Sequence, residues 1–139
     1  MPQPITSNVA HEDLSARFPV TTTVVASPAL AAETIIASLA IPQFGDVAVV
    51  SGIQLSGWAA YTVGASGTAV QLRIRQTNVA GTVVVATGAL GKTAASLYVD
   101  DVMGTDATPG VATYVLTMIV TAGAAQSTVS ACSLSAVVV

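Results

Sequence analysis

The sequence predicts an all-β protein: an antiparallel β-sandwich, jelly-roll-like with about eight strands, preceded by an extended N-terminal arm. Thr and Val dominate from Val20 onward, and Gly, Pro and Asp recur at short intervals. Many short strands separated by turn residues, at intervals of about 12 residues here, are typical of sandwiches and barrels. A chain of 139 residues has the size of one domain, so we expect a single core.

The arm is expected over residues 1–19, before a β-sandwich domain over residues 20–139. The arm holds three of the six prolines, the only histidine (His11) and the charged residues Glu12, Asp13 and Arg17. This composition favours an extended segment with at most one short helical turn, adding little to the core. The N-terminus has no basic segment followed by an apolar run, so we expect no secretory signal.

The clearest strand is Ala69–Gln76, where apolar residues alternate with polar ones and one face is expected in the core. In Thr34–Ile41 every second residue from Ile35 is apolar, and Pro42 ends the strand. Other expected strands are Val20–Ala26, Val47–Val63, Thr82–Thr87, Ala94–Val99, Val111–Thr121 and Ser127–Val138. A seven-stranded immunoglobulin-like sandwich is less favoured, because Cys132 is the only cysteine and Trp58 has no cysteine pair to pack on.

The segment from Tyr114 to Val139 carries no charge. We expect it to form a closing hairpin that turns at residues 122–124. In its second strand, Val129 and Ala131 are expected to be interleaved with Cys132 and Leu134 on the other face. Its uncharged second face is a candidate for contact with other subunits.

The composition restricts the classes of function. Hydrophobic residues make up 53% of the chain and charged residues 8%, against about 25% charged in typical soluble domains. A surface with so few ions favours obligate assembly with other protein. The net charge of −3 and the absence of a basic stripe argue against direct nucleic-acid binding.

A membrane location is not expected. The uncharged stretches 47–72 and 107–139 are broken every few residues by Gly, Ser, Thr or Gln, unlike a spanning helix. A membrane barrel remains the alternative, but it would need two aromatic girdles, and the chain has one Trp, three Tyr and two Phe.

No motif predicts catalysis, a cofactor or a metal, so we expect a protein that is not an enzyme. His11, Glu12 and Asp13 lack the convergent ligands that a metal needs. Asp100 and Asp101, with Asp106 nearby, are expected in a solvated turn. A weak cation site at an oligomer axis and contact with a basic partner remain open for them.

Four further residues are candidates for an interface. Arg73 and Arg75 share the polar face of one strand. They either keep an exposed sheet soluble and protect its edge, or pair across a subunit boundary with Glu33 or the Asp100 cluster. Trp58 and Tyr61 fall on opposite faces of one strand, so one of them is a candidate interface anchor, with sugar stacking as an alternative.

The segment Ala32–Pro42 (AETIIASLAIP), the Ala-, Thr- and Gly-rich body and the closing TYVLTMIVT segment resemble the small jelly-roll virion proteins of tailed bacteriophages. The resemblance is to the capsid decoration, or cement, proteins and covers about Val20–Val139. It implies a homotrimer on the capsid surface of the virion, bound to the major capsid protein at local threefold positions, with its arms reaching onto the shell or a neighbouring trimer. The alternative is a fibre- or tail-associated module that binds a carbohydrate or receptor.

Overall fold

The protein is all-β, as predicted. The computed structural model describes residues 21–22, 32–41, 52–64, 68–107, 113–121 and 127–138, and within these ranges the chain forms nine strands and no helix. The strands are β1 (Thr21–Thr22), β2 (Thr34–Ala40), β3 (Ile53–Val63), β4 (Thr68–Gln76), β5 (Val83–Ala86), β6 (Leu90–Lys92), β7 (Leu97–Asp106), β8 (Thr113–Thr121) and β9 (Ser127–Val138). The predicted arm, residues 1–19, lies outside the described residues.

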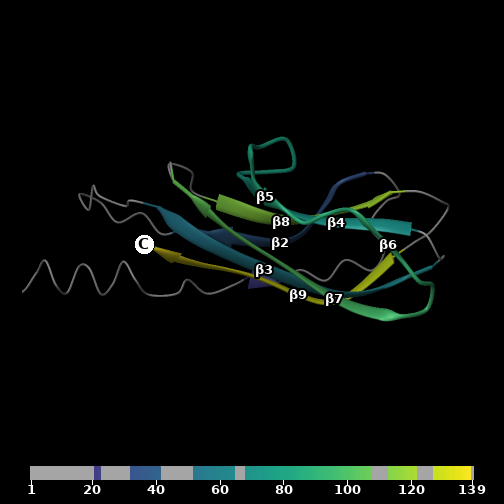
Figure 1. Cartoon of the computed structure of the whole chain (residues 1–139). Coiled ribbons are helices and arrows are strands. Elements are labelled where there is room, and N and C mark those ends of the chain that lie inside the picture. The colour runs from purple at the N-terminus through teal and green to yellow at the C-terminus, as the bar shows by residue number, and fades with distance from the viewer. Residues whose placement is uncertain are drawn as a thin grey trace, which may run out of the picture.

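The strands form two antiparallel sheets that pack face to face (Figure 1). Sheet A has the strand order β1-β2-β8-β4-β5. β5 and β6 share one edge of β4: β6 pairs with the first residues of β4, and β5 pairs with residues near its end. Sheet B has the order β7-β3-β9. The chain crosses between the sheets at most of its connections, which gives the jelly-roll-like sandwich that the sequence predicted.

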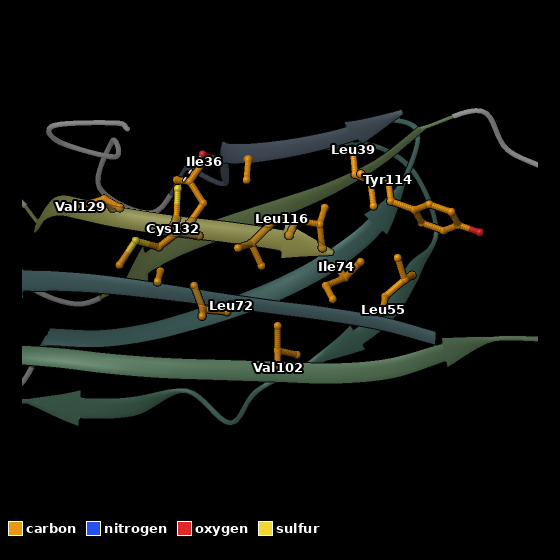
Figure 2. Packing of buried hydrophobic residues seen from close by; sticks show 14 of the residues in the cluster. Ile36, Leu39, Leu55, Leu72, Ile74, Val102, Tyr114, Leu116, Val129 and Cys132 are labelled. Atoms are coloured by element: carbon orange, nitrogen blue, oxygen red, sulfur yellow. Dashed lines mark hydrogen bonds between the residues drawn. The ribbon is translucent and has the colours of Figure 1, made fainter. Parts of the chain in front are cut away.

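The core lies between the two sheets (Figure 2). Its largest fully buried side chains include Leu55 from sheet B and Leu72 and Leu116 from sheet A. Gly57 allows the sheets to approach closely, because a Cβ atom there would lie 2.9 Å from Cδ1 of Leu116. A larger residue at this position would force Leu116 to move.

The predicted closing hairpin was wrong, because its two strands belong to different sheets. β8 lies in sheet A, where β2 and β4 occupy both of its edges. β9 therefore pairs with β3 in sheet B. β8 is the centre of sheet A and is buried on both faces: Leu116 and Thr117, which point in opposite directions, are both fully buried.

The predicted alternation of side chains in β9 was wrong, because the strand contains a β-bulge. Ala60 of β3 pairs with Ala131, but Tyr61 pairs with Val129, so Ser130 is an extra residue. The extra residue reverses the phase of the alternation. Val129 faces the core before the bulge, and every second residue from Cys132 to Ala136 faces it afterwards.

A second bulge changes the inward face of β2. The register with β8 shifts between Ile35 and Ala37, which makes Ile36 the extra residue. Ile36 is fully buried, whereas Ile35, predicted to face the core, is only partly buried. From Ala37 to Ile41 the predicted inward face is correct.

The region between residues 88 and 106 also differs from the prediction. The expected turn at Gly88–Gly91 contains the start of β6, and the expected strand from Ala94 begins only at Leu97. Ala95 has a positive φ of 58°, a left-handed conformation typical of turns. The predicted turn at the aspartates was wrong, since β7 runs straight through Asp100 and Asp101 to Asp106.

Candidate protein interface along the β5–β7 edge

Large hydrophobic side chains are exposed on strands of both sheets, at the side where β5 and β7 pack on each other and on the adjoining strand β3. Among the described residues they lie only on β3, β5, β6 and β7, and the exposed fractions are 38% for Trp58, 40% for Val83, 66% for Leu90, 64% for Leu97, 65% for Val99 and 58% for Met103. We call the surface formed by these six residues the β5–β7 edge. Gathered apolar side chains of this kind mark interaction sites on soluble proteins.

The strands β5 and β7 are edge strands of their sheets and pack on each other. Gly104 makes this packing possible, because a Cβ atom there would lie 2.6 Å from Cβ of Val85. The two sheets therefore meet along this side of the molecule. On the opposite side, the outward positions of β9 include the polar residues Thr128 and Ser130, both exposed.

The alternation of β7 determines which of its side chains face outward. Tyr98, Asp100 and Val102 point toward the sandwich interior, and the residues between them point away from it. The outward row is Leu97, Val99, Asp101, Met103 and Thr105. Trp58 lies directly opposite Asp101 on the neighbouring strand β3, so the tryptophan and the carboxylate are side by side on this face.

A shallow hollow of about 210 Å³ opens on the same edge. It is lined by Thr87, Gly88, Leu90, Lys92, Val99, Asp100 and Asp101. Leu90 and Val99 give its walls exposed apolar area. The edge therefore combines projecting side chains with a concave surface, as protein interfaces do.

Tyr61 and Asp100 are held inside the fold near this hollow. Tyr61 is fully buried and donates a hydrogen bond to Oδ2 of Asp100. Lys92 places Nζ 3.0 Å from Oδ2 of Asp100 and 4.8 Å from the ring centre of Tyr98, which stacks on Tyr61. Of the residues proposed from sequence as interface candidates, Tyr61 is therefore not accessible, and Asp100 has partners in its own chain.

These contacts also change the chemistry of Tyr61. Burial raises the pKa of its hydroxyl above the ordinary value of 10, and the hydrogen bond to the Asp100 carboxylate raises it further. The phenol therefore stays protonated and acts as a donor. The cluster of Tyr61, Lys92, Tyr98 and Asp100 joins β6 of sheet A to β3 and β7 of sheet B.

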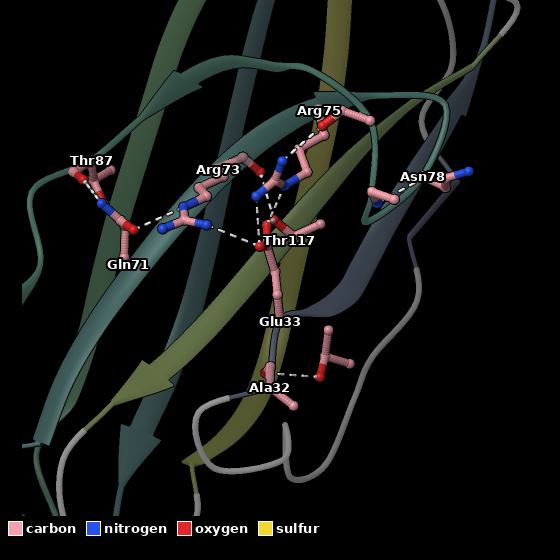
Figure 3. Close-up of polar contacts among 11 residues, drawn as sticks. Ala32, Glu33, Gln71, Arg73, Arg75, Asn78, Thr87 and Thr117 are labelled. Carbon is pink, nitrogen blue, oxygen red and sulfur yellow. Dashed lines mark hydrogen bonds and ion pairs between the residues drawn. The ribbon is translucent and has the colours of Figure 1, made fainter.

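A second polar cluster lies on the outer face of sheet A (Figure 3). Glu33 accepts hydrogen bonds from Nη1 of Arg73 at 3.0 Å, and from Nε and Nη2 of Arg75 at 2.6 and 2.8 Å. Thr117 also donates its hydroxyl to Glu33. We call Glu33, Arg73, Arg75 and Thr117 the Glu33 cluster.

The Glu33 cluster answers part of the prediction for the two arginines. Both pair with Glu33, one of the predicted partners, but they do so within the same chain. Neither protects a sheet edge, because β4 lies between β8 and the strands β5 and β6. The side chain of Glu33 is 9% exposed, that of Arg75 14% and that of Arg73 26%.

The two arginines differ in how much of their hydrogen-bonding capacity is used. Arg75 donates to Glu33 through two nitrogens and to the carbonyl oxygen of Gly81 through the third. Arg73 donates to Gln71 through Nε and to Glu33 through Nη1, while its Nη2 has no partner among the described residues. Arg73 is thus the arginine that can bind an additional acceptor.

The surroundings of Glu33 keep its carboxyl ionised. Burial by itself would raise its pKa, but hydrogen bonds from Arg75 and Thr117 and the charges of Arg75 and Arg73 lower it more. The pKa of Glu33 consequently lies below its ordinary value of 4.5. Two cations and one anion leave an excess charge of +1 on this face.

The part of the chain that the structure describes offers no metal site and no membrane-spanning helix. No group of three or more His, Cys, Asp or Glu side chains there could hold a metal ion. Asp106 is buried and accepts hydrogen bonds from Gln76 and Tyr114, so it stabilises the end of the sandwich. The same residues include no helix of the length and hydrophobicity needed to cross a membrane.

Sequence reasoning missed most of the β5–β7 edge. Leu97, Val99 and Met103 form an outward row with a period of two, but Tyr98 and Val102 form an equally apolar inward row. The pattern alone does not say which row faces the core. The wrong prediction of a turn at Asp100 also hid the strand.

Comparison with known proteins identifies the class of fold. No protein-family model matches the chain, and no curated protein sequence matches it. Solved structures from infectious bursal disease virus share the fold. The VP2 subviral particle matches with a TM-score of 0.59 and 12% identity, over 88% of this chain and 32% of that chain.

Two further structures of this virus agree. A structure of the Gx strain gives a TM-score of 0.53 and 14% identity over 86% of this chain, and one of the T13 viral particle gives 0.56 and 10% over 88%. The chain spans 29% and 30% of the length of those two chains. At such identities the likeness shows a shared β-sandwich fold.

Proposed function

We propose that the protein is a structural component of a virus particle, a capsid decoration protein that binds the outer surface of a phage head as a homotrimer and stabilises it. The observation that carries the proposal is the β5–β7 edge, an apolar surface that is exposed in the isolated chain. Such an edge is costly in water and is stabilised when other protein covers it.

Three further features support the proposal. Only 8% of the residues are charged, as expected for a chain whose surface is largely covered in an assembly. The fold is shared with chains from virus particles. A protein that binds only the mature shell lattice stabilises that lattice by mass action, which is the function that decoration requires.

We expect the purified protein to have the mass of a trimer in size-exclusion chromatography with light scattering. We also expect it to saturate purified undecorated capsids at a copy number per lattice site that is a multiple of three. A monomer at micromolar concentration would exclude the obligate trimer. Absence of binding to capsids, with the trimer intact, would exclude decoration.

A second candidate function is carbohydrate or receptor binding by a module of a fibre or tail. Trp58 favours it, because this residue is 38% exposed on the outer face of sheet B, directly opposite Asp101. An aromatic ring next to a hydrogen-bond acceptor can stack on a sugar and bind its hydroxyls.

The test is a glycan array probed with the wild type and with Trp58→Ala. Carbohydrate binding predicts a signal that is lost in Trp58→Ala and kept in Thr128→Ala, which changes an exposed residue of β9. No signal with the wild type would eliminate this candidate and leave decoration unaffected.

A further inference from the structure

We propose that copies of this chain associate head to tail around the β5–β7 edge, with Asp101 of one copy paired to Arg73 of the next. In this contact the outer face of β7 packs on the outer face of β4 and β5 of the neighbouring copy. The inference rests on the proposed homotrimer, and it names the surfaces that the subunits use.

The charges of the two faces are complementary. The exposed carboxylate of Asp101 has no hydrogen bond or ion pair with any described residue, whereas Asp100 is paired with Lys92. Arg73 belongs to a cluster with an excess charge of +1, and its Nη2 has no described partner. One face thus carries an unbalanced negative charge and the other an unbalanced positive charge, which suits contact between copies.

Both faces also carry exposed apolar side chains beside these charges. Asp101 lies between Val99 and Met103, which are 65% and 58% exposed. In register with Arg73 and Arg75 on β5 lie Ala86 and Val83, and both are exposed. Each of the two faces therefore presents small or medium-sized apolar side chains beside its charged side chains, so covering them would remove apolar surface from water and strengthen the ion pair.

The distribution of charge favours a contact between two different surfaces over a twofold contact. A twofold contact of the β7 face with itself would bring two Asp101 carboxylates together with no cation between them. A contact between two different surfaces is heterologous and closes into a ring when the rotation between neighbours fits. Both surfaces flank the same edge of the sandwich, where β5 packs on β7. The proposed ring of three closes when neighbouring copies are related by a threefold rotation.

The test is disulfide cross-linking of the full chain with cysteines at Ala86 and Met103. Both residues are exposed, and neither takes part in the core or in the Glu33 cluster. The double variant Ala86→Cys/Met103→Cys is expected to give covalent dimers and trimers on a non-reducing gel. Each single variant, and the wild type with its buried Cys132, should remain monomeric on that gel.

Charge reversal provides a second readout. We expect Asp101→Arg to raise the dissociation constant of the trimer at least tenfold, and Asp101→Arg/Arg73→Glu to recover most of that loss. Asp101→Asn is the matched neutral control, with an intermediate effect. Circular dichroism melting of each variant separates a weakened contact from a misfolded chain.

The outcomes separate this inference from the proposed function. Cross-links in Met103→Cys alone would show a twofold contact and overturn the inference. A trimer that decorates capsids but forms no covalent ladder in the double variant would overturn the inference and leave the function standing. A wild type that is monomeric and binds no capsid would refute both.

Discussion

Replacing Val99 with aspartate should convert the trimer into monomers while leaving the sandwich folded. Val99 points outward from β7 and is 65% exposed, so the isolated chain has room for a carboxylate there. In the assembly, the new charge would be buried next to Asp101 without a partner, which costs several kcal/mol. We expect the trimer dissociation constant to rise roughly a hundredfold or more.

The measurement is light scattering over a range of concentrations, with thermal melting of the monomer to verify the fold. Thr128→Asp is the matched control, because it places the same charge on an exposed position of β9, the edge strand of sheet B on the other side of β3 from β7. It should remain trimeric. A trimeric Val99→Asp, or a monomeric Thr128→Asp, would mean that the subunits meet through another surface.

Replacing Glu33 with alanine should destabilise the folded chain by about 2–3 kcal/mol. Removal of one partner of a buried ion pair leaves the other charges uncompensated, at a cost of about 3–5 kcal/mol. We expect a loss below that range for Glu33→Ala because Arg73 is 26% exposed and water screens part of its charge. Glu33→Gln keeps the shape of the side chain and removes its charge, so we expect a smaller loss. Urea unfolding at neutral pH measures both variants.

The pH dependence supplies the control for the Glu33 effect. Because the folded-state pKa of Glu33 lies below its ordinary value of 4.5, the unfolded chain binds the proton more readily below that pH. The stabilisation by Glu33 is therefore complete above pH 4.5 and is lost as the pH falls through the folded-state pKa. The stability difference between the wild type and Glu33→Gln should shrink in that range. A difference independent of pH would contradict the role of the charge.

The predicted fold follows most directly from strands with one polar face. In β4, apolar residues alternate with Gln71, Arg73 and Arg75, and the structure confirms the inward face. In β8 both faces are largely uncharged, and the sequence cannot say whether the second face meets another chain or its own. Here the side chains of the Glu33 cluster cover it. The pairing of β9 depends on which edges are free, a property of the whole sheet that local patterns do not contain.

The Glu33 cluster shows what the sequence could predict about the polar sites. One of the two interpretations of Arg73 and Arg75 paired them with an acid across a subunit boundary, and Glu33 was one of the candidates. That the partner lies in the same chain depends on the strand order. β8 lies between β2 and β4, and its Thr117 is in register with both Ile35 and Arg73. Residues 33 and 73 are therefore brought together by a register that the sequence does not encode locally.

The extra residue Ser130 has a consequence for the whole outer surface of sheet B. If β9 paired with β3 without a bulge and kept Ser130 in regular alternation, Cys132 and Leu134 would turn toward solvent and Ser133 and Ser135 would face the core. The outer face of sheet B would then expose apolar side chains on all three strands, from β7 to β9. The bulge leaves mostly small and polar side chains on the outer face of β9 and restricts the large exposed apolar side chains to β3 and β7. The bulge at Ser130 thus gives the outer face of sheet B one apolar flank and one mostly polar flank, so the proposed contact through sheet B uses only the flank formed by β3 and β7.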